Sequence, residues 1–199
     1  PRFMQNTCID TKNMDTPLSP ALQQQWRDLI STVGVLEQLR VKRLVSPIHT
    51  TYTLHVFCDA CTTGYGAVAY IIHEQTSTLL VSIVRTIPIA ELNKAPIARI
   101  ELLAAVVGAQ LRQIILTAVR RPPHKIYMWS DNQAVLCWVR ADPIAYGTYL
   151  RRRISSIQLD ARNSEWRFCP GLENPADVLS RGCTAPELLT HPLWLTGPP

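Results

Sequence analysis

Four acidic side chains in this sequence stand where they could act on one ligand. Asp59 follows an alternating apolar stretch, and Asp131 follows a second, shorter apolar stretch. Glu101 falls in the first turns of a long apolar helical pattern, and Asp177 falls near the start of a short one. Each acid alone could be a turn residue, a helix cap or a solvated acid favoured by a helix dipole. Their occurrence together in such positions favours a shared chemical role.

Clustered carboxylates define the chemistry that such a group could perform. Carboxylates repel one another, and they persist as a cluster when cations hold them together. Hard oxygen ligands around an open position suit Mg²⁺, with Mn²⁺ as a substitute. Two such ions about 3.5–4 Å apart are a common device for phosphodiester hydrolysis. The sequence therefore predicts a metal site for two ions, formed by Asp59, Glu101, Asp131 and Asp177.

The hydrophobic pattern predicts the elements that must position these acids. Alternating apolar residues predict strands, and apolar residues at helical spacing predict helices. The predicted strands cover 51–59, 67–72, 79–84, 126–129 and 166–169, and the predicted helices cover 98–119, 133–139, 144–159 and a short segment after Asn174. This order predicts an α/β fold with a five-stranded mixed sheet, three antiparallel strands followed by parallel strands, flanked by helices. If their strands are parallel neighbours, Asp59 and Asp131 meet at the sheet edge where ligands bind.

The chain divides into a main domain and two flanking segments. Residues 48–182 hold the predicted sheet and the four acids, and residues 183–199 form a tail. Residues 1–47 are an extension in which 1–19 are polar and expected to be irregular, while apolar residues at 22–39 predict one helix. The 199 residues suffice for one domain with an extension, and a hydrophobic fraction of 47% allows a sizeable core.

Charge and targeting signals narrow the class of protein. The formal charge of +5 permits a nucleic-acid partner but does not require one. No segment has the pattern of a signal peptide, and no run approaches the roughly 18 apolar residues of a membrane helix, so we expect no membrane association. Because the sequence begins at Pro1, we expect it to be a segment of a longer polypeptide.

The cysteines offer an alternative metal chemistry. Cys58 and Cys61 form a C-x-x-C pair, one of the patterns of zinc and redox sites. A second such pair or a histidine pair is missing from the sequence, and the motif ends a strand pattern rather than opening a helix. We therefore expect Cys58 to be a buried thiol, Cys61 to lie in a turn, and no zinc to be bound.

Several motifs around the acids resemble those of retroelement ribonucleases H, in the form found in BEL/Pao-type retrotransposons. The resemblance is carried by residues 57–66, 99–105, 129–133 and 174–182, and also by 22–47 and 191–198. It covers most of the chain, and the four acid-bearing motifs occur in the family's order. The resemblance implies a ribonuclease H-like fold, an RNA–DNA hybrid as partner, and a reverse transcriptase domain in the same polyprotein. It also implies an intracellular, cytoplasmic location in a virus-like particle.

The resemblance further implies a role for each acid. The RNA strand of the hybrid would be cut endonucleolytically, giving 5′-phosphate products, with two metal ions at the site. Asp59 would bridge both ions, Asp177 would hold the ion on the side of the attacking water, and Glu101 and Asp131 would hold the ion on the leaving-group side. The family thus assigns catalytic and metal-binding roles to the same four residues.

Substrate contacts are expected from a second set of residues. Selectivity for RNA would come from contacts to 2′-hydroxyl groups, for which Gln133 is a candidate, and a plain surface glutamine is the alternative. Arg151, Arg152 and Arg153 are candidates for phosphate contact, and a solvated helix face is the alternative. Cellular enzymes carry a histidine in the loop before the last helix, whereas residues 168–173 contain none.

Related nuclease folds with other chemistry fit less well. A proofreading exonuclease would have a glutamate two residues after the first aspartate, where this chain has Cys61. An integrase would have its glutamate after the second aspartate, whereas Glu101 precedes Asp131. A non-catalytic, domesticated or decayed copy that only binds nucleic acid or serves as a scaffold remains open as the alternative function.

Overall fold

A single mixed sheet organises the chain in the computed structural model, which describes residues 2–11, 13, 15–40, 51–91 and 94–198. The strands are β1 (Thr53–Ala60), β2 (Gly64–His73), β3 (Thr76–Thr86), β4 (Lys125–Ser130) and β5 (Glu165–Phe168), in the spatial order β3-β2-β1-β4-β5. The first three strands pair antiparallel, and β4 runs parallel to both β1 and β5. The predicted five-stranded mixed sheet is confirmed.

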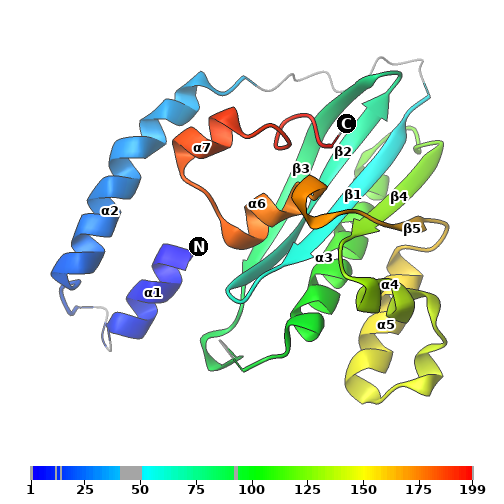
Figure 1. The fold of residues 1–199 in the computed structure, drawn as a ribbon, viewed down its shortest axis with the longest axis horizontal. Helices are drawn as coiled ribbons and strands as arrows, with labels where there is room; N and C mark the ends of the chain where they lie inside the picture. The colour runs from blue at the N-terminus through cyan, green and yellow to red at the C-terminus, as the bar shows by residue number, and fades with distance from the viewer. Residues whose placement is uncertain (1, 12, 14, 41–50, 92–93, 199) are drawn as a thin grey trace.

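Helices cover both faces of the sheet (Figure 1). The helices α3 (Ile97–Ala118), α4 (Gln133–Arg140) and α5 (Thr148–Asp160) lie on one face. The short helices α6 (Ala176–Arg181) and α7 (Ala185–Thr190) lie on the other face together with the end of the chain. Besides the α-helices, the described residues form four short 3-10 helices: η1 (Gly34–Gln38), η2 (Ile89–Glu91), η3 (Pro143–Ala145) and η4 (Gly171–Glu173).

The alternation of side chains along β1 sets which residues face which layer. Leu54, Val56 and Cys58 are buried in the cluster under α3, whereas Phe57 belongs to a second cluster on the α6 face. The register pairs Phe57 with Trp129 of β4 in a parallel ladder. Residues that follow the two strands by the same number of positions therefore emerge at one edge of the sheet.

The helix α3 packs directly on the centre of the sheet. It is long and apolar enough to cross a membrane, but 61% of its most apolar window is buried inside the protein, as in the core helix of a globular domain. A Cβ atom at Gly108 would lie 2.2 Å from the Sγ atom of Cys58, so only glycine permits this close approach to β1. The contact fixes the position of α3, and with it Glu101, against the sheet.

The amino-terminal segment is more helical than the sequence pattern predicts. The polar residues 1–19 were expected to be irregular, yet α1 (Arg2–Asp10) is a helix. The predicted helix after it is α2 (Pro20–Val33), which buries Leu22 but leaves Trp26 and Ile30 about half exposed. The expected boundary between residues 47 and 48 lies outside the described residues.

Two further expectations need correction. The helix predicted to start at residue 144 starts at Thr148, because Ile144 lies in the 3-10 turn η3, whose start is capped by the Asp142 side chain. Residues 183–199, which were expected to be a tail, contain α7 and bury Trp194 against the α6 face. The Tyr70 hydroxyl of β2 donates to the Trp194 carbonyl at 2.8 Å, which ties this segment to the sheet.

Candidate metal centre and active site

Three of the four sequence-predicted acids meet at one edge of the sheet. Asp59 comes from the end of β1, Glu101 from the first turns of α3, and Asp131 from the residue after β4. One carboxylate oxygen of each residue lies within 4.8 Å of the corresponding oxygens of the other two. Asp59 and Glu101 are buried, with 3% and 8% of their surface exposed. The three elements thus bring three carboxyl groups together in a poorly solvated place.

The position of Asp59 is fixed by α6. The Ser180 hydroxyl donates a hydrogen bond to Asp59 Oδ2. The buried Asn174 clamps the start of α6 to β1, because its Nδ2 donates to the Cys58 carbonyl at 3.0 Å and its Oδ1 accepts from the Ala176 amide at 3.1 Å. The short helix therefore holds the carboxylate from the face opposite α3.

The carboxylate of Asp131 can join the cluster because the next residue, Asn132, caps the helix α4 in its place. Asn132 is the N-cap of α4, and its Oδ1 accepts from the amides of Ala134 and Val135 at 3.0 and 3.3 Å. The alternative in which Asp131 itself serves as the cap is therefore wrong. Gly171 of the turn η4 lies against the carboxylate, since a Cβ atom there would come within 3.1 Å of Asp131 Oδ2.

The electrostatics show that the cluster carries more negative charge than its surroundings stabilise. Burial raises the pKa of Glu101 to about 9, and the charges of Asp59 and Asp131 add to this, while a hydrogen bond from the Ala60 backbone opposes it. Burial also raises the pKa of Asp59 to about 6, against the hydrogen bond from Ser180, and it raises the pKa of Asp131. The Glu101 Oε2 atom is buried without a hydrogen-bond partner.

A divalent cation fits this environment. Three hard carboxylate ligands and one buried oxygen without a partner form an incomplete site, and a cation would lower the pKa of each acid by favouring its charged form. The group that could bind a metal, among the residues that the structure describes, contains carboxylates only, which suits Mg²⁺ or Mn²⁺.

Asp177 lies beside this group rather than within it. It occupies the first turn of α6, and its carboxylate is paired with Arg181 one turn later. Its charge still raises the pKa values of Asp59 and Asp131, which places it near the same edge. Sequence reasoning missed the partners Ser180 and Arg181. They stand three and four positions after Asp177, the spacing that brings helical side chains together, and this was the available signal.

The predicted substrate residues lie on α4 and α5. Gln133 is the first residue of α4 and is exposed two positions after Asp131. Arg151 and Arg152 are exposed on α5, and the first donates to the Ile144 carbonyl at 3.1 Å. In the described part of the chain, none of these arginines is within ion-pair distance of a carboxylate.

Arg153 forms part of a basic and aromatic group with Arg99 and Tyr149. Its guanidinium carbon lies 3.5 Å from the ring centre of Tyr149, and that of Arg99 lies 5.0 Å from the same ring. Arg153 Nε is buried without a hydrogen-bond partner. Because Arg99 stands two positions before Glu101 on α3, this group brings two positive charges close to the start of the acid-bearing helix.

The C-x-x-C cysteines have separate environments. Cys58 is buried under α3 as predicted, where burial and the nearby acids raise its pKa, so that it stays a neutral thiol. Cys61 lies in the bend after β1, as predicted, and its thiol donates to the Ser180 carbonyl at 2.8 Å.

Comparison with protein families shows which family the sequence matches. The model of the family described as Pao retrotransposon-like RNaseH-like domain matches residues 1–132. The matched part contains Asp59, Glu101 and Asp131, whereas Asp177 lies beyond it. No curated protein was found to match the chain.

Solved structures share the fold at low sequence identity. The foamy viral protease–reverse transcriptase in complex with double-stranded DNA has a TM-score of 0.52 at 12% identity, covering 85% of this chain and 33% of that chain. A second structure of the foamy viral protein, the dRH form with double-stranded DNA, has a TM-score of 0.53 at 11% identity, with coverages of 84% and 27%. The N-terminal RNase H domain of a Mycobacterium tuberculosis protein has a TM-score of 0.48 at 16% identity, with coverages of 66% and 92%.

Proposed function

Because the chain belongs to the Pao retrotransposon-like RNaseH-like domain family, we propose that it is an endonuclease that hydrolyses the RNA strand of RNA–DNA hybrids during reverse transcription. The ribonuclease H-like fold agrees with this function. The observation that carries the proposal is the cluster of Asp59, Glu101 and Asp131, with its buried, unpartnered Glu101 oxygen. Such a site is complete only when cations are bound.

The residues have distinct parts in this proposal. Asp59, Glu101 and Asp131 would hold two divalent cations, which supply positive charge at the scissile phosphate and make water a better nucleophile. Ser180 and Asn174 keep Asp59 oriented, as their hydrogen bonds indicate. Asp177 would join the other acids once its ion pair with Arg181 opens. Its proposed role is to hold the ion on the side of the attacking water.

The substrate would approach the edge where these acids lie. Gln133 is proposed to contact a 2′-hydroxyl group, since it is exposed at the start of α4 beside Asp131. Arg151, Arg152 and Arg153 are proposed to contact backbone phosphates. The support is that no carboxylate neutralises them within the described residues, and that Arg153 keeps an unpartnered Nε.

Hydrolysis of a labelled hybrid tests the activity. The chain should cut the RNA strand of an RNA–DNA hybrid with Mg²⁺ or Mn²⁺ and leave 5′-phosphates, while double-stranded RNA and the Asp59→Asn variant serve as controls. Replacing Mg²⁺ by Ca²⁺ should leave binding intact and suppress cleavage, because the looser Ca²⁺ geometry misplaces the reacting atoms. Binding of the hybrid without any cleavage in Mg²⁺ or Mn²⁺ would instead favour a non-catalytic nucleic-acid-binding or scaffold domain.

The salt dependence of hybrid binding tests the arginines. Changing Arg151, Arg152 and Arg153 together to Gln should weaken binding and flatten its dependence on salt, since fewer counterions are released. A matched control changes Arg27, Arg40 and Arg120, which are exposed on other parts of the chain. An unchanged salt slope in the α5 variant would assign those arginines to a solvated helix face.

A further inference from the structure

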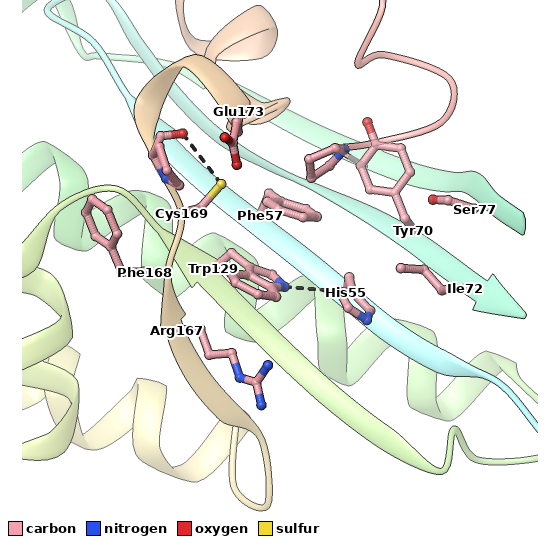
Figure 2. Close-up of a pocket in the computed structure, with 12 residues that line it drawn as sticks. His55, Phe57, Tyr70, Ile72, Ser77, Trp129, Arg167, Phe168, Cys169 and Glu173 are labelled. Atoms are coloured by element: carbon pink, nitrogen blue, oxygen red, sulfur yellow. Dashed lines mark hydrogen bonds between the residues drawn. The ribbon is translucent and has the colours of Figure 1, made fainter. Parts of the chain in front are cut away.

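An aromatic pocket lies on the α6 face of the sheet, away from α3 (Figure 2). Its volume is about 350 Å³, within the size range of small-ligand sites. His55, Phe57 and Trp129 lie along its floor, and Figure 2 shows Glu173 and Tyr70 on one side of this row and Arg167 on the other. The residues come from β1, β2, β4 and the turn η4, so rigid elements form most of the pocket.

The floor of the pocket is an ordered stack of rings. Phe57 and Trp129 are register partners, and their rings lie 9° from parallel with centres 5.7 Å apart. The ring of His55 lies 18° from that of Trp129 at 5.8 Å. Trp129 is only partly buried and lines the pocket, so it offers an aromatic ring against which another flat ring can stack.

Hydrogen bonds hold this stack in one arrangement. Trp129 Nε1 donates to His55 Nδ1 at 3.2 Å. Since an indole can only donate, His55 Nδ1 must accept, and the proton of the neutral ring is on Nε2, 3.2 Å from Thr53 Oγ1. The floor is therefore preorganised, and a ligand need not order it.

The charged side chains of the pocket, Arg167 and Glu173, lie at its rim. Arg167 of β5 is exposed, its guanidinium lies 4.3 Å from the ring centre of Tyr127, and it is paired with the exposed Glu165 carboxylate at 2.8 Å, a pair that a bound phosphate would have to replace. Burial and the charge of Arg167 lower the pKa of His55 to about 4, so the floor is uncharged near neutral pH. Glu173, exposed on the opposite wall, offers an acceptor for amino groups. A flat, neutral floor with a cation and an acceptor at its edges suits a nucleobase that carries a phosphate.

The pocket lies next to the acid cluster. Phe57 and Trp129 precede Asp59 and Asp131 by two positions each, roughly 7 Å along a strand. The turn η4 contacts both regions, because its Gly171 touches Asp131 while its Glu173 lines the pocket. A strand of nucleic acid at the acids therefore has the pocket within about one nucleotide.

We propose that this pocket binds one unpaired base of a single-stranded nucleic acid, stacked against Trp129 with its phosphate at Arg167. The choice of nucleic acid as ligand rests on the proposed function, but the binding itself needs neither metal nor cleavage. The site would hold a displaced or protruding strand next to the place where the hybrid is cut.

Strand binding in excess EDTA tests the proposal. The probes are a labelled single-stranded deoxyoligonucleotide and a strand of equal length made only of abasic sugar phosphates, with affinity measured by fluorescence anisotropy. Trp129→Leu should weaken binding of the normal strand by about 10- to 100-fold, the effect of one lost base stack. Trp129→Phe, which keeps a ring, should stay within about threefold of the parent, and thermal unfolding should show that both variants fold.

The control is Trp26→Leu, which removes an indole exposed on α2 and should bind the strand as the parent does. Equal affinity of the parent for the abasic and normal strands, or parent-like binding by Trp129→Leu, would overturn the proposal. The proposal would also be overturned if a proline-rich peptide bound through Trp129 while the protein showed no preference for the normal strand over the abasic strand. A parent that binds the strand in EDTA but never cleaves hybrids in Mg²⁺ would remove the proposed hydrolysis and leave this site.

Discussion

The strands β1 and β4 carry two neighbouring regions, one formed by acidic side chains and the other by stacked aromatic rings. At their carboxyl ends, Asp59 and Asp131 meet Glu101, three like charges with a buried oxygen left unpartnered. Two positions earlier on the same face, Phe57 and Trp129 stack in register with every polar edge satisfied. The first region is incomplete without a ligand, whereas the second is already formed.

The two regions should also respond to pH in opposite directions. The raised pKa values of Asp59, about 6, and Glu101, about 9, mean that the folded chain keeps protons that the unfolded chain loses. The cluster thus costs stability as pH rises from the ordinary carboxyl range toward 9. The lowered pKa of His55, about 4, has the reverse effect: its contribution is complete above pH 6.5 and is lost as pH falls toward 4.

The largest effect should come from removing one charge of the cluster. Asp131→Asn keeps the size of the side chain but, in the proposed mechanism, would weaken the hold on the cation that Asp131 helps to bind. Hydrolysis of the hybrid should fall by several orders of magnitude, because that cation stabilises the charge on the departing oxygen. Hybrid affinity, measured on the same preparation, should change little. Cleavage at the parent rate would show that Asp131 has no catalytic part.

Magnesium should stabilise the fold through the cluster. At about 100 times its dissociation constant, a ligand that binds only the folded state adds roughly 2.7 kcal/mol to the free energy of unfolding. The gain should be larger at pH 8 than at pH 5, since protons compete with the metal for the carboxylates. Thermal unfolding at both pH values, with and without Mg²⁺, measures this. A gain of equal size in the Asp59→Asn variant would place the binding elsewhere.

Removing the unpartnered acid should stabilise the metal-free protein. Glu101→Gln should raise the free energy of unfolding by about 1–3 kcal/mol at pH 8, because the buried acid no longer costs energy either as a charge or as a retained proton. The difference from the parent should vanish below the ordinary carboxyl pKa. Urea unfolding in EDTA across this pH range provides the comparison. Glu37→Gln, in the exposed 3-10 helix η1, is the matched control, and a destabilised Glu101→Gln would mean that the Glu101 Oε2 atom has a partner.

Much of the fold could be predicted because local patterns agree with the final packing. The alternating residues before Asp59 form a strand and the helical pattern around Glu101 forms a helix, as predicted. Both predictions are right because the apolar faces of these two elements pack together in the core. The convergence of Asp59 and Asp131 followed from the same reasoning, because parallel neighbours end at one edge.

The features that were missed depend on contacts between distant segments. The burial of Trp194 against β2 and the stack of Phe57 on Trp129 appear only once the strand order and register are known. The helix α1 was missed because its few apolar residues form no helical periodicity, and none of its residues with a described side chain is fully buried. The ion pair that turns Asp177 away from the other acids is set by side-chain geometry, which spacing alone does not specify.

The smallest effect should come from the histidine in the aromatic stack. His55→Gln keeps a side chain that can accept from Trp129 and donate to Thr53, but it cannot take up a proton. Because the folded protein holds His55 neutral down to about pH 4, protonation between pH 6.5 and 4 favours the unfolded chain in the parent only. The parent should therefore lose more stability than the variant as pH falls through this window, and the two should run parallel above it.

Urea unfolding of both proteins from pH 7.5 to 4.5 isolates this contribution, since the carboxylates titrate alike in each and cancel in the difference. His124→Gln, a change at an exposed histidine, is the control and should follow the parent. If the His55→Gln curve keeps the parent's slope, the imidazole is solvated enough to charge in the folded state. The floor of the pocket would then carry a positive charge in mild acid. The affinity of Trp129 for a stacked base would then depend on pH, because the neighbouring His55 would become charged in mild acid.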